Sequence, residues 1–259
     1  MDFMKPETVL NLGNIRDALV RMEDTIVFNF IERSQFYSSP SVYEIDKFEI
    51  PDFVGGSFLD WTMLQLEKLQ SQIRRFEAPD ELPFFPKEIL KSFLPPIGYP
   101  NVLASYSTEI NFNDEIKKFY IQDIVPLISC GEGEQPENLG STCTADIECL
   151  QSLSRRIHFG KFVAEAKFQS EKELFIKLIK EKNVKGLEDA ITNSVVEEKI
   201  LQRLVEKGKA YGVDPSLKYS QNPQSKVNPE IIAVIYKKWI IPLTKKVEID
   251  YLLRRLECE

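Results

Sequence analysis

The chain has 259 residues, enough for one large hydrophobic core or two small ones, and 43% of them are hydrophobic, as in a globular protein. Its net charge of −7 argues against a general nucleic-acid-binding protein, which would carry a basic surface. The amino end lacks the apolar run of a signal peptide, and no aliphatic stretch is long enough to span a bilayer.

The cysteine and histidine content argues against several kinds of metal and catalytic site. The four cysteines form no C-x-x-C pair, so neither a disulfide framework nor a zinc site is expected, and we predict a cytoplasmic protein without a metal. Hydrolytic triads and most metal sites use histidine, and this chain has a single one. His158 is two residues from Arg156 and should point away from it, which favours a structural role.

Residues 10–35 are predicted to form the first long helix, capped by Asn14. Arg16 would lie in its first turn, where the helix dipole disfavours a cation. It is therefore either aimed at a bound anion or a solvated surface residue. The apolar stripe of this helix has helical spacing and consists of Ile15, Leu19, Met22, Ile26 and Phe30.

An irregular stretch over 36–56 leads to a second helix, which should begin after Ser57 with Asp60 completing a capping box. Arg74 and Arg75 lie near its end, where position alone favours solvated cations. The apolar face of this helix is a candidate surface for a second subunit. Its expected stripe is Leu59, Met63, Leu66, Ile73 and Phe76.

The middle of the chain is rich in proline. Six prolines over 79–100 predict an extended, ordered segment with one short helix near Lys87–Phe93. A further helix should start at Asn113, as its cap, and run to Leu127. The polar, acidic loop Gly131–Leu139 follows.

The stretch Ser141–Ser170 contains no proline and is predicted to form one long central helix. Arg156 and Lys167 are about three turns apart on it, so both should point to one side, with Cα atoms roughly 16 Å apart. Gly160 and Val163 lie between them on that face. Such a recess suits a small ligand with more than one negative charge. The alternative is two surface cations with extended stems.

Shorter helices are predicted near residues 174–179, 187–191 and 194–209. Asn193 and Glu197 lie on or near the buried face of the last of these. Buried polar groups need partners, and the partner here is either a ligand or an internal hydrogen bond.

A polar, turn-rich segment over 212–228 precedes a final helix that should begin near Asn228 and be kinked by Pro242. Thr244 and Glu248 share an inward-facing strip of this helix. The apolar residues expected on the same side are Ile241 and Tyr251.

The pattern as a whole predicts an all-α protein. The sequence has no strand-like alternation of any length, no glycine-rich phosphate loop and no repeat of fixed period. We expect a single domain over residues 1–259, a helical bundle of about ten to twelve helices per subunit around the long central helix with its active-site cations.

The sequence resembles the allosteric, all-helical chorismate mutases of fungi, and the similarity runs over nearly the whole chain. The longest similar stretch is Ile147–Gln169, which is far more specific than a short motif. The others are Lys5–Leu12, Asn14–Asp17, Ser71–Glu77, Thr192–Ser194, Val196–Ile200 and Tyr251–Leu256.

The resemblance implies the Claisen rearrangement of chorismate to prephenate, on the route to phenylalanine and tyrosine. This reaction needs no cofactor, metal or nucleophile. The substrate carries two carboxylates, and negative charge builds on its ether oxygen because C–O cleavage runs ahead of C–C formation. An enzyme should therefore hold the folded conformer and aim donors at that oxygen.

By family position, Arg16 and Arg156 would bind the two carboxylates as planar forks. Lys167 and Glu248 would reach the ether oxygen. Glu248 must then be a neutral acid, because an ionised carboxylate would repel the developing charge. The remaining predicted catalytic residues would hold other polar groups of the substrate or support its carboxylate side, and are Asn193, Glu197 and Thr244.

The resemblance also implies a homodimer that is inhibited by tyrosine and activated by tryptophan at a site between subunits. A free helix N-terminus accepts an amino-acid carboxylate, and a nearby arginine adds a second contact. Effectors bound at the start of the central helix could move the cations further along it. The predicted effector-binding residues are Arg74, Arg75, Asn138, Gly140, Ser141 and Thr144.

Two other functions were weighed. A helical isoprenoid-type lyase or synthase would need an Asp-rich cluster for magnesium and diphosphate, and no D-D-x-x-D run is present. A non-catalytic helical interaction protein would not need this combination of cations, carboxylates and an amide.

Overall fold

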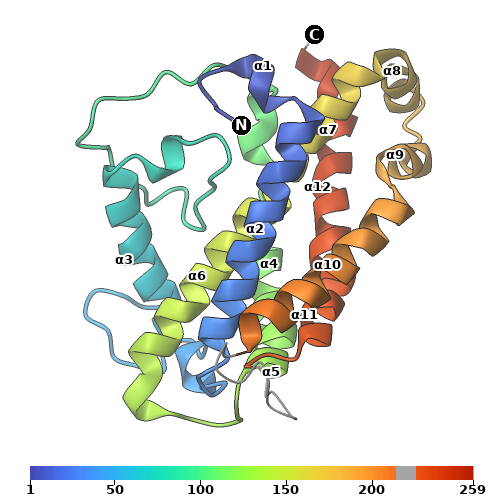
Figure 1. Cartoon of the computed structure of the whole chain (residues 1–259). Coiled ribbons are helices and arrows are strands. Elements are labelled where there is room, and N and C mark those ends of the chain that lie inside the picture. Colours follow the sequence, from blue (N-terminus) through green and yellow to red (C-terminus); the bar gives the residue numbers. More distant parts are fainter. Residues whose placement is uncertain (214–225, 259) are drawn as a thin grey trace.

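The computed structural model describes residues 1–213 and 226–258, and their regular elements are helical, with one isolated bridge between Ile50 and Phe53 (Figure 1). The predicted all-α class is confirmed. Most of the turn-rich segment predicted over 212–228 lies outside the described residues.

Long segments separate α2 from α3 and α3 from α4. The α-helices are α1 Pro6–Val9, α2 Leu12–Arg33, α3 Phe58–Gln72, α4 Asn113–Phe119, α5 Val125–Ile128, α6 Leu139–His158, α7 Gly160–Ser170, α8 Lys172–Lys180, α9 Val184–Ile191, α10 Ser194–Gly212, α11 Pro229–Ile235 and α12 Ile241–Leu253.

Helices α6 and α7 run end to end through the centre of the bundle (Figure 1). Helix α2 packs along α6, α12 packs along α7, and α10 packs on α11. Helix α3 flanks α6 on one side, while α8 to α12 lie on the other (Figure 1). This arrangement leaves a space between α2, α7, α10 and α12 near the middle of the molecule.

The stretch Ser141–Ser170 is helical as predicted, but it forms two consecutive helices and not one. The helical path begins at Leu139 and is interrupted at Phe159, which precedes Gly160. The backbone N–H of Phe159 still donates to the carbonyl of Arg155 at 3.0 Å, so the hydrogen-bonded path continues through the break. Glycine is a weak helix former, which accounts for a break here.

The start of α2 differs from the prediction by three residues. The N-cap is Asn11, whose side-chain oxygen accepts hydrogen bonds from the backbone N–H groups of Gly13 and Asn14. The Asn14 side chain instead donates to the carbonyl of Thr8 at 2.9 Å. Arg16 therefore lies at the start of the second turn, further from the positive helix end than expected.

The capping box of Ser57 and Asp60 is confirmed, and α3 begins where the sequence predicts. The helix ends earlier than its apolar stripe suggested. Ile73 is 58% exposed, and Arg74 adopts a left-handed backbone conformation with φ of 69°. Ile73 was wrongly placed on the buried stripe, because the chain turns away before completing another helical turn.

The short helix predicted near Lys87–Phe93 is absent. The backbone N–H of Leu90 donates to the Ser71 hydroxyl, and that of Phe93 donates to the carbonyl of Gln72. These amides are therefore used to dock the segment on the end of α3, and they are not available for a local helix.

Two helices contain wide turns beside a proline. A π-helical turn over Tyr120–Ile124 joins α4 to α5, and another over Tyr236–Ile240 joins α11 to α12. Pro126 and Pro242 each occupy the second position of the helix that follows. A proline lacks the N–H that a regular ladder requires, so the distortion occurs at the preceding turn. The kink predicted at Pro242 takes this form, and Asn113 is the first helical residue of α4, not its cap.

A fully buried ion pair joins α2 to α6. The Arg33 Nε donates to Asp146 Oδ1 at 2.6 Å, and both side chains are 0% exposed. The hydroxyls of Tyr43 and Tyr120 donate to the same carboxylate at 2.7 and 2.6 Å. Burial raises the pKa of Asp146, and these three donors are what keep the carboxylate satisfied inside the core.

Replacing Arg33 by Met should leave the Asp146 carboxylate buried without its counterion. We expect a loss of about 3–5 kcal/mol in the free energy of unfolding, measured by urea denaturation with far-UV circular dichroism. The control is Lys47→Ala, which breaks an exposed pair with Glu44 and should cost under about 1 kcal/mol. Equal losses in the two variants would show that the buried ion pair contributes no more to the free energy of unfolding than the exposed pair.

Candidate active site

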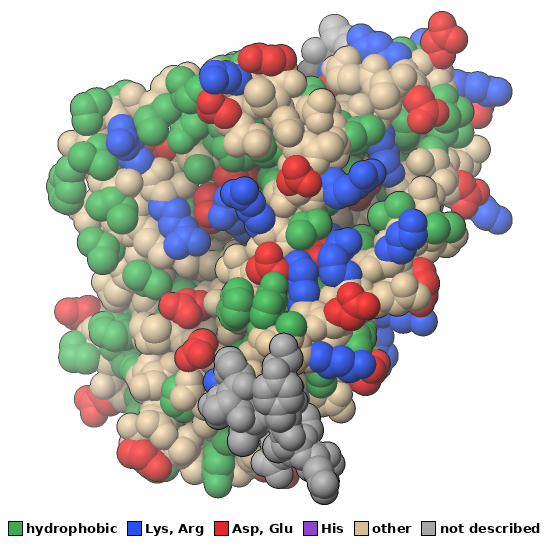
Figure 2. Space-filling view, in the orientation of Figure 1, with side chains coloured by type: hydrophobic (Ala, Val, Ile, Leu, Met, Phe, Trp, Pro, Cys, Tyr) green, Lys and Arg blue, Asp and Glu red, His purple; other side chains and the backbone are tan. Residues whose placement is uncertain are grey.

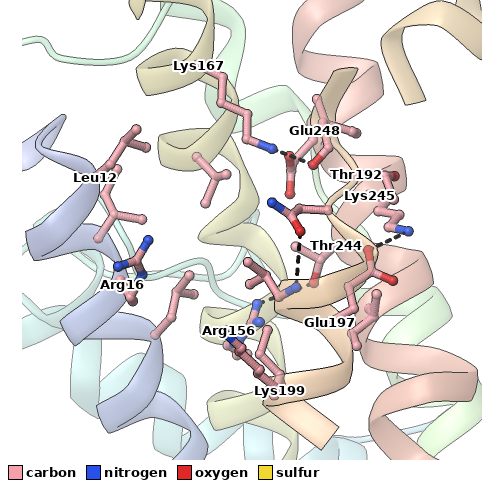
Figure 3. Close-up of a pocket in the computed structure, with 18 of the residues that line it drawn as sticks. Leu12, Arg16, Arg156, Lys167, Thr192, Glu197, Lys199, Thr244, Lys245 and Glu248 are labelled. Atoms are coloured by element: carbon pink, nitrogen blue, oxygen red, sulfur yellow. Dashed lines mark hydrogen bonds and ion pairs between the residues drawn. The ribbon is translucent and has the colours of Figure 1, made fainter. Parts of the chain in front are cut away.

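A cavity of about 650 Å³ opens between α2, α7, α10 and α12 (Figure 3). Every residue predicted to be catalytic lines it, although these residues come from five helices and the α9–α10 junction. They are Arg16, Arg156, Lys167, Asn193, Glu197, Thr244 and Glu248. Lys and Arg side chains gather on the face formed by α2 and α10 (Figure 2).

The cations Arg16, Arg156 and Lys167 form no ion pair with a carboxylate within the part of the chain that the structure describes. Arg156 is buried, lies 3.5 Å from the Thr244 hydroxyl through one terminal nitrogen, and has an unpartnered Nε. The Lys167 ammonium donates to the carbonyl of Ile191, the last residue of α9. Arg16 is exposed at the cavity mouth.

Glu248 lines the same cavity as these cations, and it lies on α12 facing α7. It is 6% exposed, and its Oε2 has no hydrogen-bond partner. Burial raises the pKa of Glu248 to about 7, although Lys167, Arg156 and Lys245 act in the opposite direction. At mildly acidic pH the group is therefore a neutral acid with a proton to donate into the cavity.

The internal hydrogen bonds considered for Asn193 and Glu197 are present, and both residues also line the cavity. Asn193 is the N-cap of α10, where its side-chain oxygen accepts from the backbone N–H of Val196 at 3.1 Å. Its amide nitrogen is left as a donor. Glu197 forms an ion pair with Lys245 at 2.7 Å across the cavity (Figure 3).

Two residues expected on the cavity surface lie elsewhere. Tyr251 donates from its hydroxyl to the Glu165 carboxylate at 2.6 Å, on the side of α7 away from the cavity. Gly160 does not form a recess in the cavity floor. It packs against α12 beside Thr244 and Glu248.

His158 has the structural role that its position predicts. Its Nε2 accepts a hydrogen bond from the backbone N–H of Phe112 at 2.9 Å, so the ring is held in a neutral form. Burial lowers the pKa of His158 to about 3. It contributes no charge to the cavity near neutral pH.

Five polar residues of the cavity wall, four of them charged, were not predicted from the sequence. Glu23 on α2 accepts two hydrogen bonds from Arg203 on α10, each 2.8 Å long. Helical spacing from known neighbours could have found them, since Lys199 and Arg203 are one turn apart on α10. The missed residues are Glu23, Thr192, Lys199, Arg203 and Lys245.

The structure does not bring together the residues predicted to bind effectors. Arg75 pairs with Glu81 at 3.3 Å, and Glu81 also lies 3.6 Å from Arg155 near the carboxyl end of α6. Ser141 is at the other end of α6, about 21 Å from Arg155 along the helix axis. Within one chain the predicted set is therefore divided into two groups.

The described residues contain neither a metal-binding cluster nor a membrane-spanning helix. No group of three or more His, Cys, Asp or Glu side chains among them is arranged to hold a metal ion. No helix in the described ranges combines the length and the apolar character needed to cross a membrane.

Comparison with known sequences gives a consistent result. Residues 140–249 match the profile of the family described as chorismate mutase type II. The chorismate mutase of Pichia angusta is 67% identical, over 100% of this chain and 92% of the relative. That of Saccharomyces cerevisiae is 61% identical, over 99% of this chain and 100% of the relative.

Solved structures agree. A chorismate mutase from Candida albicans, crystallised as a complex with L-Trp, is 70% identical and superposes with a TM-score of 0.97 over 100% of this chain and 97% of that one. The structure of AtCM1 with tyrosine bound in its allosteric site is 39% identical, with a TM-score of 0.85 over 95% of this chain and 96% of that one.

Replacing Glu248 by Gln should change how stability depends on pH. The pKa of Glu248 is higher in the folded protein, so its stabilising contribution is present below the unfolded pKa and is lost as pH rises through about 7. Between pH 5 and pH 8 the wild type should lose up to about 3 kcal/mol relative to Glu248→Gln, measured by urea denaturation.

The control for this measurement is Glu206→Gln, at an exposed position on α10, which should follow the wild type at both pH values. A constant difference between wild type and Glu248→Gln at pH 5 and pH 8 would show that Glu248 is not held as a buried neutral acid.

Proposed function

The chain belongs to the chorismate mutase family and is an isomerase that converts chorismate to prephenate, and we propose that the cavity between α2, α7, α10 and α12 is its active site. Two properties of the cavity support this assignment. Within the described part of the chain, three of its cations, Arg16, Arg156 and Lys167, form no ion pair with a carboxylate, and the substrate is a dianion. A buried acid lies beside them, and the reaction needs a donor for an oxygen that gains charge.

To catalyse the rearrangement, an enzyme must bind one conformer of the substrate and stabilise negative charge in the transition state. The enolpyruvyl arm must fold over the ring before the new C–C bond can form, and binding that conformer removes much of the entropic barrier. The ether oxygen becomes more negative in the transition state, so donors fixed at that position stabilise the transition state more than the ground state.

We assign the two carboxylates of the substrate to Arg16 and Arg156. Arg156 has the donors for a bidentate contact, since its Nε is unpartnered and its terminal nitrogen is only 3.5 Å from the Thr244 hydroxyl. Thr244 then supports the same carboxylate. Arg16 lies at the mouth, where it can close on the second carboxylate from the α2 side.

We assign the ether oxygen to Lys167 and Glu248. Lys167 is held by a neutral carbonyl, so its charge remains available to the substrate. The observation that carries the proposal is the Glu248 carboxyl, buried without a partner for Oε2 beside these cations. Asn193 and Glu197 would orient the remaining polar groups of the substrate.

Glu248→Gln should retain activity and lose most of its decline at higher pH. In the wild type, kcat/KM should fall as pH rises through the pKa of Glu248, because the ionised form no longer donates and repels the developing charge. The amide donates at every pH. The measurement is chorismate loss followed by ultraviolet absorbance in metal-free buffer from pH 5 to 9.

A control variant is measured in the same assay. Lys245→Gln removes a cation that favours ionisation of Glu248, so this variant should keep the decline and move its midpoint to higher pH. If the glutamine protein at position 248 declines with the wild-type midpoint, Glu248 is not the titrating group. If the wild type does not consume chorismate at any pH, the assignment of the reaction is wrong.

We further infer that tryptophan activates and tyrosine inhibits this chain, by analogy with relatives that bind these amino acids. The start of α6 has the properties of a carboxylate site. No side chain caps its first turn, and Asn138 at the N-cap makes no side-chain hydrogen bond. Gly140 has open space around it, and Ser141 and Thr144 are exposed.

A second copy of the chain would complete this site. In the same subunit Arg75 shares Glu81 with Arg155, which is about 21 Å along α6 from Ser141, so Arg74 and Arg75 would have to come from the partner. An exposed apolar surface beside them supports a homodimer, and hydrophobic side chains are visible over α3 in Figure 2. This surface consists of Leu69, Ile73, Ile89, Leu90, Phe93 and Leu94.

The path from effector to substrate would run along α6. Its first turn would bind the effector, and Arg156 in its last turn lines the cavity. Because α7 continues the same path, a small rotation of α6 would change the positions of Arg156 and Lys167 together. Coupling then requires only that tyrosine and tryptophan favour different orientations.

A complementation experiment tests the shared site. Arg75→Ala removes one half of the site, and Gly140→Asp places a negative charge in open space at the other half. Each homodimer should bind tryptophan at least about tenfold more weakly, measured by calorimetry. Mixed dimers made by co-expression should regain one site with wild-type affinity, because the intact halves meet across one interface.

Two results would contradict the proposed effector site between subunits. Wild-type affinity in either single variant would remove that residue from the site. Mixed dimers with no tight site would show that both halves belong to one subunit or that the chain does not pair. Light scattering of the wild type gives the oligomeric state independently.

We also propose a cytoplasmic location. Cys130, Cys143 and Cys149 are free thiols, and burial raises the pKa of the Cys149 thiol well above its ordinary value. Unreactive, unpaired thiols are typical of a reducing compartment.

A further inference from the structure

Gly160 occupies the point of closest approach between α7 and α12. A Cβ atom at this position would lie 3.0 Å from the carbonyl oxygen of Thr244, 3.1 Å from its Cγ2 and 3.2 Å from Cγ of Glu248. All three distances are shorter than ordinary van der Waals contacts. Gly160 is helical and needs no left-handed conformation, so the reason for glycine here is steric.

The closest of these contacts involves the main chain of α12, and rotation of a side chain cannot relieve it. A methyl group at residue 160 would have to push the first turn of α12 away from α7 by a few tenths of an ångström. Thr244 and Glu248 both project from this part of α12 into the cavity. Any displacement there moves two groups assigned to the substrate.

The same displacement would change the surroundings of Glu248. Arg156, Lys167 and Lys245 face this carboxyl group from α6, α7 and α12, and Glu197 faces it from α10. Its neutral form depends on the exclusion of water, because all three cations favour ionisation. Opening the α7–α12 contact would admit solvent and so favour the ionised form.

We propose that Gly160 is a positioning residue for catalysis: the missing side chain sets the spacing of α7 and α12 that holds Thr244 and Glu248 against the substrate. This inference rests on the assignment of the cavity as the active site. A packing role alone would predict a loss of stability without a change in catalysis. The proposed role predicts that kcat and its pH dependence change when α12 is displaced.

The test compares Gly160→Ala with Gly208→Ala, which is matched in its steric demand. A Cβ at Gly208 would lie 3.0 Å from Cα of Pro229 in α11, so this variant also forces two packed helices apart. Gly208 does not line the cavity. Both variants should lower the urea midpoint, and only Gly160→Ala should alter catalysis.

For Gly160→Ala we expect kcat to fall about tenfold while KM changes less than about threefold, since the bound geometry at the ether oxygen is displaced. The midpoint of the pH decline should move to lower pH, because a better-hydrated Glu248 ionises more easily. The pH profile of the double variant Gly160→Ala/Glu248→Gln should match that of Glu248→Gln alone, which would show that the pH effect of Gly160→Ala acts through that carboxyl group.

The proposal is overturned if Gly160→Ala and Gly208→Ala lose similar stability and both keep the wild-type kcat and pH midpoint. Absence of chorismate turnover in the wild type would instead reject the active-site assignment on which it rests. If Gly160→Ala does not fold, Gly160→Ala/Thr244→Ser removes one of the three short contacts. Its kcat and pH midpoint relative to Thr244→Ser alone then decide the question.

Discussion

The interaction on which the site depends is the attraction between a dianion and cations that the protein leaves without carboxylate partners. In the described part of the chain, Arg156 and Lys167 are oriented by neutral oxygens, the hydroxyl of Thr244 and the carbonyl of Ile191. The carbonyl lies at the carboxyl end of α9, where the helix dipole favours a cation. Neutral acceptors fix the direction of these side chains without cancelling their charge, so the substrate supplies the missing negative charge.

The carboxylates around the cavity are kept from interfering with this arrangement. Glu197 is paired with Lys245, and Glu23 with Arg203, so their charges are already balanced. Glu248 has no such partner, and burial favours its neutral form instead. One pocket therefore contains carboxyl groups in two environments, two in ion pairs and one buried without a cation partner at hydrogen-bond distance.

The helices reach this arrangement through local irregularities. A break at Phe159 separates α6 from α7, yet Arg156 and Lys167 remain on one side. The π-helical turn before Pro242 redirects α12 toward α7, and Gly160 allows the two helices to come into close contact. The buried Arg33 side chain joins the carboxyl end of α2 to α6, away from these irregularities.

The sequence by itself determined the helical class, most helix positions and the residue types of the site, because a 3.6-residue period and capping chemistry are local properties. Arg156 and Lys167 were found in this way. The sequence could not determine that residues 87–93 bond to α3, that Lys245 pairs with Glu197, or that the effector residues are divided within one subunit. Only the tertiary structure decided these points and the burial that raises the pKa of Glu248, because ion pairing and pKa depend on which distant segments come within a few ångströms and how completely they exclude water.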